Sequence, residues 1–289
     1  MNVEDEKNLE IISLVGCIVS LVSLCGVFAT ALISKKWLRG PGQKILLQMA
    51  INLALLLIMY LVAAYAKAQG TGCMIIGFFL HYTILSNFLW MAVAGYLQYY
   101  RLVRIFSSRT TKLVLKSAIV GWVVPVIPGL VLLSTEQYNS ETRFCLPKKE
   151  WILHATMIAP VCIVLVFNIV IFIMIVKNLY MTTRPRQHVD KCISIRRFKQ
   201  LAFLFTLLGL NWIFGVSQIA FPDLSVFFAY LFCITITFQG MTYFVFFVLH
   251  EKVRDSWELL ILYFRKIKSN VDAEGITMDT VTESVSQSK

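Results

Sequence analysis

The chain has 289 residues, of which 58% are hydrophobic, and its mean hydropathy is +0.72. A soluble domain of this length cannot bury so much apolar surface, so the composition excludes an ordinary water-soluble fold. The net charge of +11 does not indicate a nucleic-acid partner, because the basic residues are dispersed in short connections between apolar stretches.

Seven apolar stretches contain none of the Lys, Arg, Asp and Glu residues of the chain. Each has 19 to 27 residues. A helix that rises about 1.5 Å per residue needs roughly 20 residues to cross about 30 Å of hydrocarbon. The pattern therefore predicts an all-α fold, a seven-transmembrane helix bundle with spans at 11–34, 45–66, 74–100, 117–135, 151–176, 200–222 and 224–250.

The connections alternate in basic charge along the chain. One set holds 5 Lys and Arg residues and the other set holds 22. Cationic loops resist translocation, so the richer set is predicted to be cytoplasmic, facing anionic lipid or a cytosolic partner. We expect a multi-pass protein of the plasma membrane with its N-terminus outside and its C-terminus in the cytoplasm.

The predicted domain layout follows from these spans. Residues 1–8 form a short extracellular N-terminus, 9–250 the membrane domain, 251–268 an amphipathic eighth helix on the inner membrane face, and 269–289 a disordered tail. No cleavable signal peptide is visible, because four of the first ten residues are acidic and the first apolar run is of full span length. We expect the chain to be a fragment of a longer protein.

Two of the seven cysteines lie on the predicted outer side. Cys73 is at the outer end of the third span and Cys145 is in the second outer loop. The outside compartment is oxidising, so a disulfide between them is predicted. The cysteines within spans are interpreted as small packing residues.

The spans lack the groups that most membrane chemistry needs. A transporter usually requires ionisable side chains in the membrane, and a retinal protein requires a lysine there. The four histidines are scattered, so catalysis, a cofactor and a metal site are not expected. A conformational switch is favoured; the polar residues in the spans, such as Gln48, Asn52, Asn87, Gln98, Asn168, Asn211 and Gln239, either take part in it or form static interhelical bonds.

Five strings carry a family resemblance in the right order: LEIISLVGC at 9–17, HYTILSNFLWM at 81–91, IVGWVVP at 119–125, LGLNWIFG at 208–215 and FQGMTYFVFFVLHEKVRDSW at 238–257. Together they resemble the membrane domain of the adhesion family of G-protein-coupled receptors. The resemblance implies a heterotrimeric G protein as partner and a tethered or free peptide agonist. The binding site that it implies, for which plain core packing is the alternative, comprises Phe88, Met91, Trp212, Phe232 and Gln239.

The implied switch comprises residues of the sixth helix around Trp212 and of the inner half of the third helix. Gly209 and Gly215 flank Trp212 and lower the cost of bending the sixth helix. The other predicted switch residues are Ala94, Leu97, Gln98 and Asn211, and the predicted coupling residues are Arg101, Arg104, Arg196, Arg197 and Lys199.

The chain also departs from the family pattern. Ala94 stands where a Glu is usual, Leu97 where a His is usual and Leu146 where a Trp is usual. These departures keep an alternative open: a non-signalling seven-helix membrane anchor or adhesion scaffold. A transporter is the third possibility.

Overall fold

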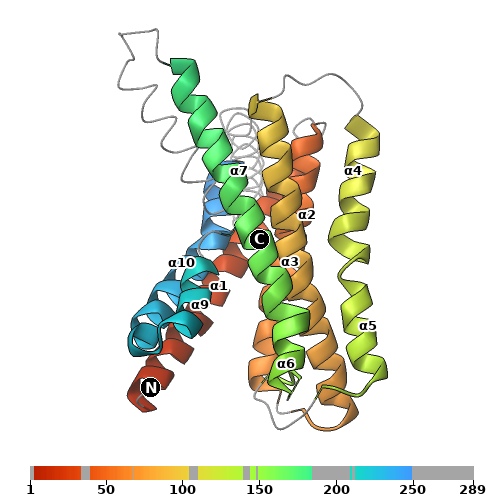
Figure 1. The fold of residues 1–289 in the computed structure, drawn as a ribbon, viewed down its shortest axis with the longest axis vertical. Coiled ribbons are helices and arrows are strands. Elements are labelled where there is room, and N and C mark those ends of the chain that lie inside the picture. The colour runs from red at the N-terminus through yellow and green to blue at the C-terminus, as the bar shows by residue number, and fades with distance from the viewer. Residues whose placement is uncertain are drawn as a thin grey trace, which may run out of the picture.

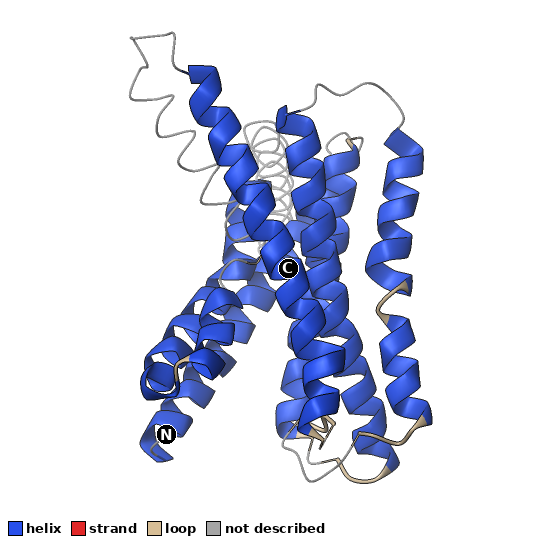
Figure 2. Ribbon diagram, viewed as in Figure 1, coloured by secondary structure: helices blue, strands red, loops and turns tan. Residues whose placement is uncertain are grey.

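The computed structural model describes residues 3–33, 40–66, 68–103, 110–138, 144–147, 149–183, 209 and 212–248. Within these ranges the ordered elements are helices, joined by short loops with one isolated bridge between Tyr138 and Pro147 (Figure 2). The α-helices are α1 (Val3–Ile33), α2 (Pro41–Tyr65), α3 (Thr71–Val103), α4 (Thr110–Ala118), α5 (Val126–Ser134), α6 (Glu150–Leu153), α7 (Ala159–Thr183), α9 (Trp212–Ala220) and α10 (Ser225–Val248).

Six helical segments of the described chain are long and apolar enough to cross a membrane. They match the first five predicted spans and the seventh, so the prediction of an all-α membrane bundle is confirmed. The sixth predicted span, 200–222, is described only at Gly209 and from Trp212 onward. The predicted eighth helix at 251–268 and the tail lie outside the described residues.

The ends of the helices follow from local sequence. Pro41 occupies the first turn of α2, where its missing N–H costs no hydrogen bond, and Gly40 precedes it as the N-cap. α1 begins ahead of the apolar stretch, because three acidic residues in its first turn complement the positive end of the helix dipole.

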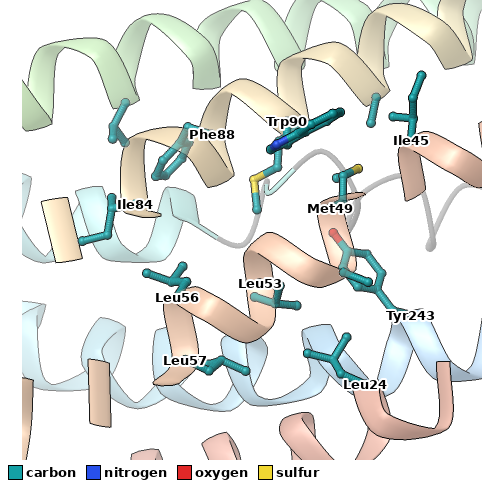
Figure 3. Close-up of a cluster of buried hydrophobic side chains, with 14 of the residues drawn as sticks. Leu24, Ile45, Met49, Leu53, Leu56, Leu57, Ile84, Phe88, Trp90 and Tyr243 are labelled. Atoms are coloured by element: carbon teal, nitrogen blue, oxygen red, sulfur yellow. The ribbon is translucent and has the colours of Figure 1, made fainter. Parts of the chain in front are cut away.

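α3 is the most buried of the six described spans. In Figure 1, α2, α3, α4 and α5 lie on one side of the bundle and α1, α9 and α10 form a group on the other. The core between the two sides includes Leu53, Leu56 and Leu57 of α2, with Tyr243 of α10 reaching toward them (Figure 3).

Two short π-helices interrupt the fourth and fifth spans, and a proline follows each one. The first, η2, covers Ile119–Val123 and precedes Pro125. Proline has no N–H, so Pro125 cannot donate to the carbonyl of Gly121 four residues earlier. The hydroxyl of Ser86 on α3 donates to that carbonyl at 2.7 Å. A side chain of α3 thus replaces the lost helical bond.

The second π-helix repeats this arrangement. η3 covers His154–Ile158 and precedes Pro160, which leaves the carbonyl of Thr156 without its helical donor. Nε2 of His81 on α3 lies 3.2 Å from that oxygen. α3 therefore holds the fourth and fifth spans through backbone groups that proline has released.

Candidate functional site

The outer loop between α5 and α6 is fixed to α3 by the predicted disulfide. Cys73 and Cys145 are bonded, with 5.3 Å between their Cα atoms, so this prediction is confirmed. A Cβ atom at Gly77, one turn along α3, would overlap the carbonyl of Cys145, so the close approach of the loop requires glycine there.

His81, further along α3, also holds the outer loop in place. A carbonyl only accepts, so the bond to Thr156 requires a proton on Nε2 of the ring. Nδ1 of the neutral ring is then an acceptor, and it lies 3.0 Å from the hydroxyl of Tyr138. Burial raises the pKa of Tyr138, so its hydroxyl keeps its proton and donates. α3, η3 and the outer loop are joined through one imidazole.

A cavity opens beside this anchored loop at the N-terminal end of α1. We call it the outer vestibule; its volume is about 560 Å³. Side chains of α1, α2, α9, α10 and the outer loop line it, among them Glu6, Tyr60, Phe144 and Gln218. The rings of Tyr60 and Phe144 stack with their centroids 5.7 Å apart, so the loop contributes part of the wall.

A second cavity of about 250 Å³, the inner cavity, adjoins the vestibule. The two share the lining residues Ser13, Tyr60, Phe144, Phe232 and Cys233. The inner cavity is mostly apolar and reaches Asn87, Trp212 and Gln239 in the middle of the bundle. The two cavities therefore lie next to each other, one at the outer end of the bundle and one in its core.

Trp212 is the central aromatic residue of this site. Its ring packs edge to face on Phe88 of α3 and on Phe232 of α10, with centroid distances of 4.8 Å in both cases. Trp212, Phe232 and Gln239 line the inner cavity. Phe88 is buried behind Trp212, away from the cavity lining.

Met91 is also buried, and it lies against Gly209 of the sixth span. Gly209 has φ +67°, and a Cβ atom there would overlap the sulfur of Met91. The left-handed backbone and the lack of space both favour glycine. A Cβ at Gly215 would lie 3.1 Å from the ring of Phe232, so the other predicted hinge glycine packs against the site.

The remaining predicted switch and coupling residues are distributed differently. Ala94 and Leu97 are buried in the apolar core, and Gln98 is half-buried on the same helix. Arg101 lies in the last turn of α3, where the structure does not describe its side chain. Outside the described residues are Asn211, Arg104, Arg196, Arg197 and Lys199.

Several lining residues were missed at the level of sequence, notably Ser13 and Cys17 of α1, Tyr60 of α2 and Phe144 of the loop. No local motif marks them, because they come from two helices and a loop that are far apart in the sequence and meet only in the folded bundle.

Comparison with known proteins identifies the family. A family model described as "7 transmembrane receptor (Secretin family)" matches residues 6–243. The chain belongs to the secretin family of seven-transmembrane receptors. The match runs from the vestibule residues of α1 into α10, so it includes the whole described site.

Relatives of this receptor are named adhesion G-protein coupled receptors. It is 29% identical to the human adhesion G-protein coupled receptor G2 over 97% of its own length, and 29% identical to the mouse receptor G4 over 88%. It is 28% identical to the mouse receptor E1 over 96%. These relatives confirm the resemblance to adhesion receptors. The chain spans only 30% of the length of the human G2 receptor and 8% of the mouse G4 receptor.

Proposed function

We propose that this receptor domain transmits a stimulus from a tethered or free peptide to a heterotrimeric G protein by movement of the sixth helix. The observation that carries the proposal is the position of Trp212. Its ring is exposed to the inner cavity and packs on Phe232, while its other contact is the buried Phe88 of α3. A ligand in the cavity would press on Trp212, which packs directly on a buried side chain of α3.

The backbone before Trp212 supplies the hinge. The N–H of Trp212 donates to the carbonyl of Gly209 at 3.0 Å, and Gly209 has left-handed backbone. α9 begins directly after Gly209 and its left-handed backbone, so we infer that the outer segment of the sixth span bends at this glycine. A ligand that prefers one rotation shifts the population of the coupled inner state.

The orientation is part of the proposal: the N-terminus and the disulfide face outside, and the C-terminus is in the cytoplasm of the cell, beneath the plasma membrane. α1 begins at the end of the bundle where the outer loop is bonded to α3. Epitope tags inserted at residues 139 and 188 should be reached by antibody from outside and only after permeabilisation, respectively. Labelling of both without permeabilisation would contradict the topology.

The test of function is peptide-dependent nucleotide exchange on a panel of purified G proteins. The receptor is reconstituted in phosphatidylcholine nanodiscs, and an apolar peptide similar to the family's agonist is titrated. We expect a saturable increase that Trp212→Ala removes and that Trp151→Ala, an exposed outer tryptophan, retains. Absence of exchange with every G protein, in protein that binds peptide, would exclude signalling.

A second function is favoured by one specific observation. Ala94 and Leu97 are buried among apolar side chains at the inner half of α3, where the family pattern has polar groups. A bundle held there by apolar packing alone would suit a non-signalling anchor for an adhesive ectodomain. The nucleotide-exchange experiment separates the two functions.

A further inference from the structure

The connection between α9 and α10 exposes apolar side chains at the outer end of the bundle. A short 3₁₀ helix, η4 (Pro222–Leu224), joins the two helices, and Phe221, Leu224 and Phe227 around it are exposed. Phe221 and Phe227 each contact the ring of Phe228, with centroids 6.1 and 5.7 Å apart. We call Phe221, Leu224 and Phe227 the outer apolar patch. In Figure 1 this connection and the N-terminal end of α1 lie at the same end of the bundle.

Two contacts fix the height of α10 against α1. Oγ of Ser13 lies 3.4 Å from Sγ of Cys233, and a Cβ atom on Gly240 would overlap the side chain of Ser20. The members of each pair differ by 220 in residue number. The two helices therefore run in the same direction with a constant register between these contacts.

This register places the outer apolar patch beside a charged segment of α1. With the same offset, Phe227 lies level with Lys7. The hydroxyl of Tyr230 on α10 donates to the carboxylate of Asp5 at 3.4 Å, which agrees with that level. Five of the seven residues at 4–10 are charged. Charged side chains are too costly to place in hydrocarbon, so this level lies outside the apolar core of the membrane.

The outer apolar patch lies at the depth of the lipid headgroups. The first apolar stretch begins at residue 11, so the level of Phe227 is four residues, or about 6 Å, further out. The headgroup layer adds roughly 5 to 7 Å to each face of a hydrocarbon core of about 30 Å. The seventh apolar stretch, 224–250, has 27 residues. As a helix it spans about 40 Å, so it extends beyond the core by about 10 Å.

The patch is continuous with the surface of α10 that faces lipid. Phe227, Ile234 and Met241 are exposed and seven residues apart, so they form one stripe along the helix. Leu224, three residues before Phe227, extends this stripe outward. Exposed apolar patches mark contacts with proteins or membranes, and continuity with a lipid-facing stripe favours the membrane.

The charge around the patch favours a lipid without net negative charge. Asp223 is exposed between Phe221 and Leu224, and no other Lys, Arg, Asp or Glu occurs between residues 200 and 250. The adjacent segment of α1 adds four acidic residues against Lys7. Such surroundings repel an anionic headgroup and attract the cationic choline of phosphatidylcholine, which the faces of exposed aromatic rings also attract.

We propose that the outer apolar patch is a membrane contact that inserts into the choline headgroup layer of the adjacent leaflet. This contact holds the end of α9. The N–H of Phe221 donates to the carbonyl of Ser217 in α9 at 2.9 Å, and the N–H of Leu224 donates to the carbonyl of Phe221 at 3.1 Å. The helix that begins at Trp212 is thus anchored to lipid at its outer end. The inference is independent of peptide binding and of G-protein coupling.

Site-specific photo-cross-linking of the full chain tests this contact. The photoreactive residue p-benzoylphenylalanine replaces Phe227, or separately Leu224, in protein reconstituted into phosphatidylcholine liposomes. Ile234, on the lipid-facing stripe, is the positive control site. Gln69, an exposed residue of the loop between α2 and α3, is the negative control site. Intact-mass analysis after irradiation measures the fraction of protein with a lipid adduct, and fragmentation locates the adduct on the lipid.

Lipid adducts should form at Phe227 and Leu224 with a yield at least about fivefold above that at Gln69. They should be located on the choline methyl groups or the glycerol region, whereas those at Ile234 should be on the acyl chains. Yields at both patch sites no higher than at Gln69 would show that the patch faces water, and would overturn the proposal. Covalent dimers as the main product would assign the patch to a second copy of the chain, and would overturn it as well.

Variants of the patch test whether its apolar side chains drive the insertion. Phe221→Gln combined with Leu224→Gln removes apolar area and should lower the adduct yield at Phe227 about threefold or more. Asp223→Asn is the matched control, because it changes the same segment without removing apolar area, and it should retain the yield. An unchanged yield in the double variant would overturn apolar insertion.

Lipid composition tests the preference for choline headgroups. Replacement of half of the phosphatidylcholine by phosphatidylglycerol should lower the yield at Phe227 about twofold relative to that at Ile234, because the acidic neighbours repel the anionic headgroup. A relative yield that stays the same or rises with phosphatidylglycerol would overturn this preference.

Discussion

The two sides of the bundle differ in how their buried polar groups are paired. On the side of α2 to α7, the carbonyls released by proline at Gly121 and Thr156 are both bonded to side chains of α3. On the side of α1, α9 and α10, the indole N–H of Trp212 and the amide N–H of Gln239 have no partner among the described residues. One side has its released carbonyls bonded, and the other has buried donors without partners on side chains that line a cavity.

This difference teaches which side can move. The bonds to the two released carbonyls have one favourable arrangement, because displacement of α3 from the fourth or fifth span leaves these oxygens unpaired. Other buried atoms of α3, Nδ2 of Asn87 and Nε1 of Trp90, have no partner among the described residues. Donors that have no partner lose no hydrogen bond when the helices that carry them shift. We therefore regard α3 with its partners as the fixed frame and α9 with α10 as the responsive side.

Loss of the disulfide, which joins the outer loop to the frame, should have the largest effect of the changes considered. Cys73→Ser and Cys145→Ser should each strongly lower surface expression, because each removes the covalent link between frame and loop, a link typically worth about 2–4 kcal/mol. Cell-surface biotinylation measures the effect. The double variant should be no worse than either single one, and Cys25→Ser, at an exposed position, should be neutral. Two free outer thiols in intact-mass analysis of folded protein would contradict the prediction.

Truncation of Trp212 should mainly affect the responsive side, α9 and α10. Trp212→Ala should raise the peptide concentration for half-maximal exchange at least about tenfold, because a desolvated tryptophan contributes about 2 kcal/mol or more. If Trp212→Ala leaves both peptide binding and response unaltered at normal expression, the ligand site is elsewhere.

His81→Ala should show the reverse pattern. It leaves the hydroxyl of Tyr138 and the carbonyl of Thr156 without their partner, at a cost of about 1–3 kcal/mol. We expect a lower melting temperature with a nearly unchanged peptide dose-response. His154→Ala, at an exposed histidine, is the control. A His81→Ala variant with the melting temperature of the parent would show that these hydrogen bonds do not stabilise the frame.

The smallest effect is expected at the inner half of α3. Ala94→Glu combined with Leu97→His introduces polar groups that can bond neighbouring helices and hold the resting state, at a gain of about 1–2 kcal/mol. Basal exchange should then fall and the peptide-dependent increment should grow. Tyr96→His, on the exposed face of α3, controls for the imidazole itself. Unchanged basal and stimulated exchange in the double variant would exclude such a lock.

The sequence predicted the fold more fully than the site. Span positions follow from hydropathy alone, and the disulfide follows from two cysteines in an oxidising compartment. The π-helices were not predicted, although Pro125 and Pro160 mark them, because proline alone does not say which neighbour will bond the released carbonyl.

The predicted site residues occupy two kinds of position, which the sequence did not distinguish. Trp212, Phe232 and Gln239 line the inner cavity, but Phe88 and Met91 lie behind it. Helical spacing indicates which residues share a face, and not on which side of an aromatic ring the open space lies. The presence of Glu6 and Glu10 in the lining of the outer vestibule depends on how α1 packs on α10. No local sequence pattern reveals this long-range contact.

The two prolines have a consequence for how the protein assembles in the membrane. A helix with Pro125 or Pro160 enters lipid with one backbone oxygen lacking its helical donor, and hydrocarbon offers no water to replace it. Ser86 and His81 supply donors only once α3 has docked. The fourth and fifth spans are thus incomplete as independent insertion units, and we expect them to join α3 early, before α1 closes against α10.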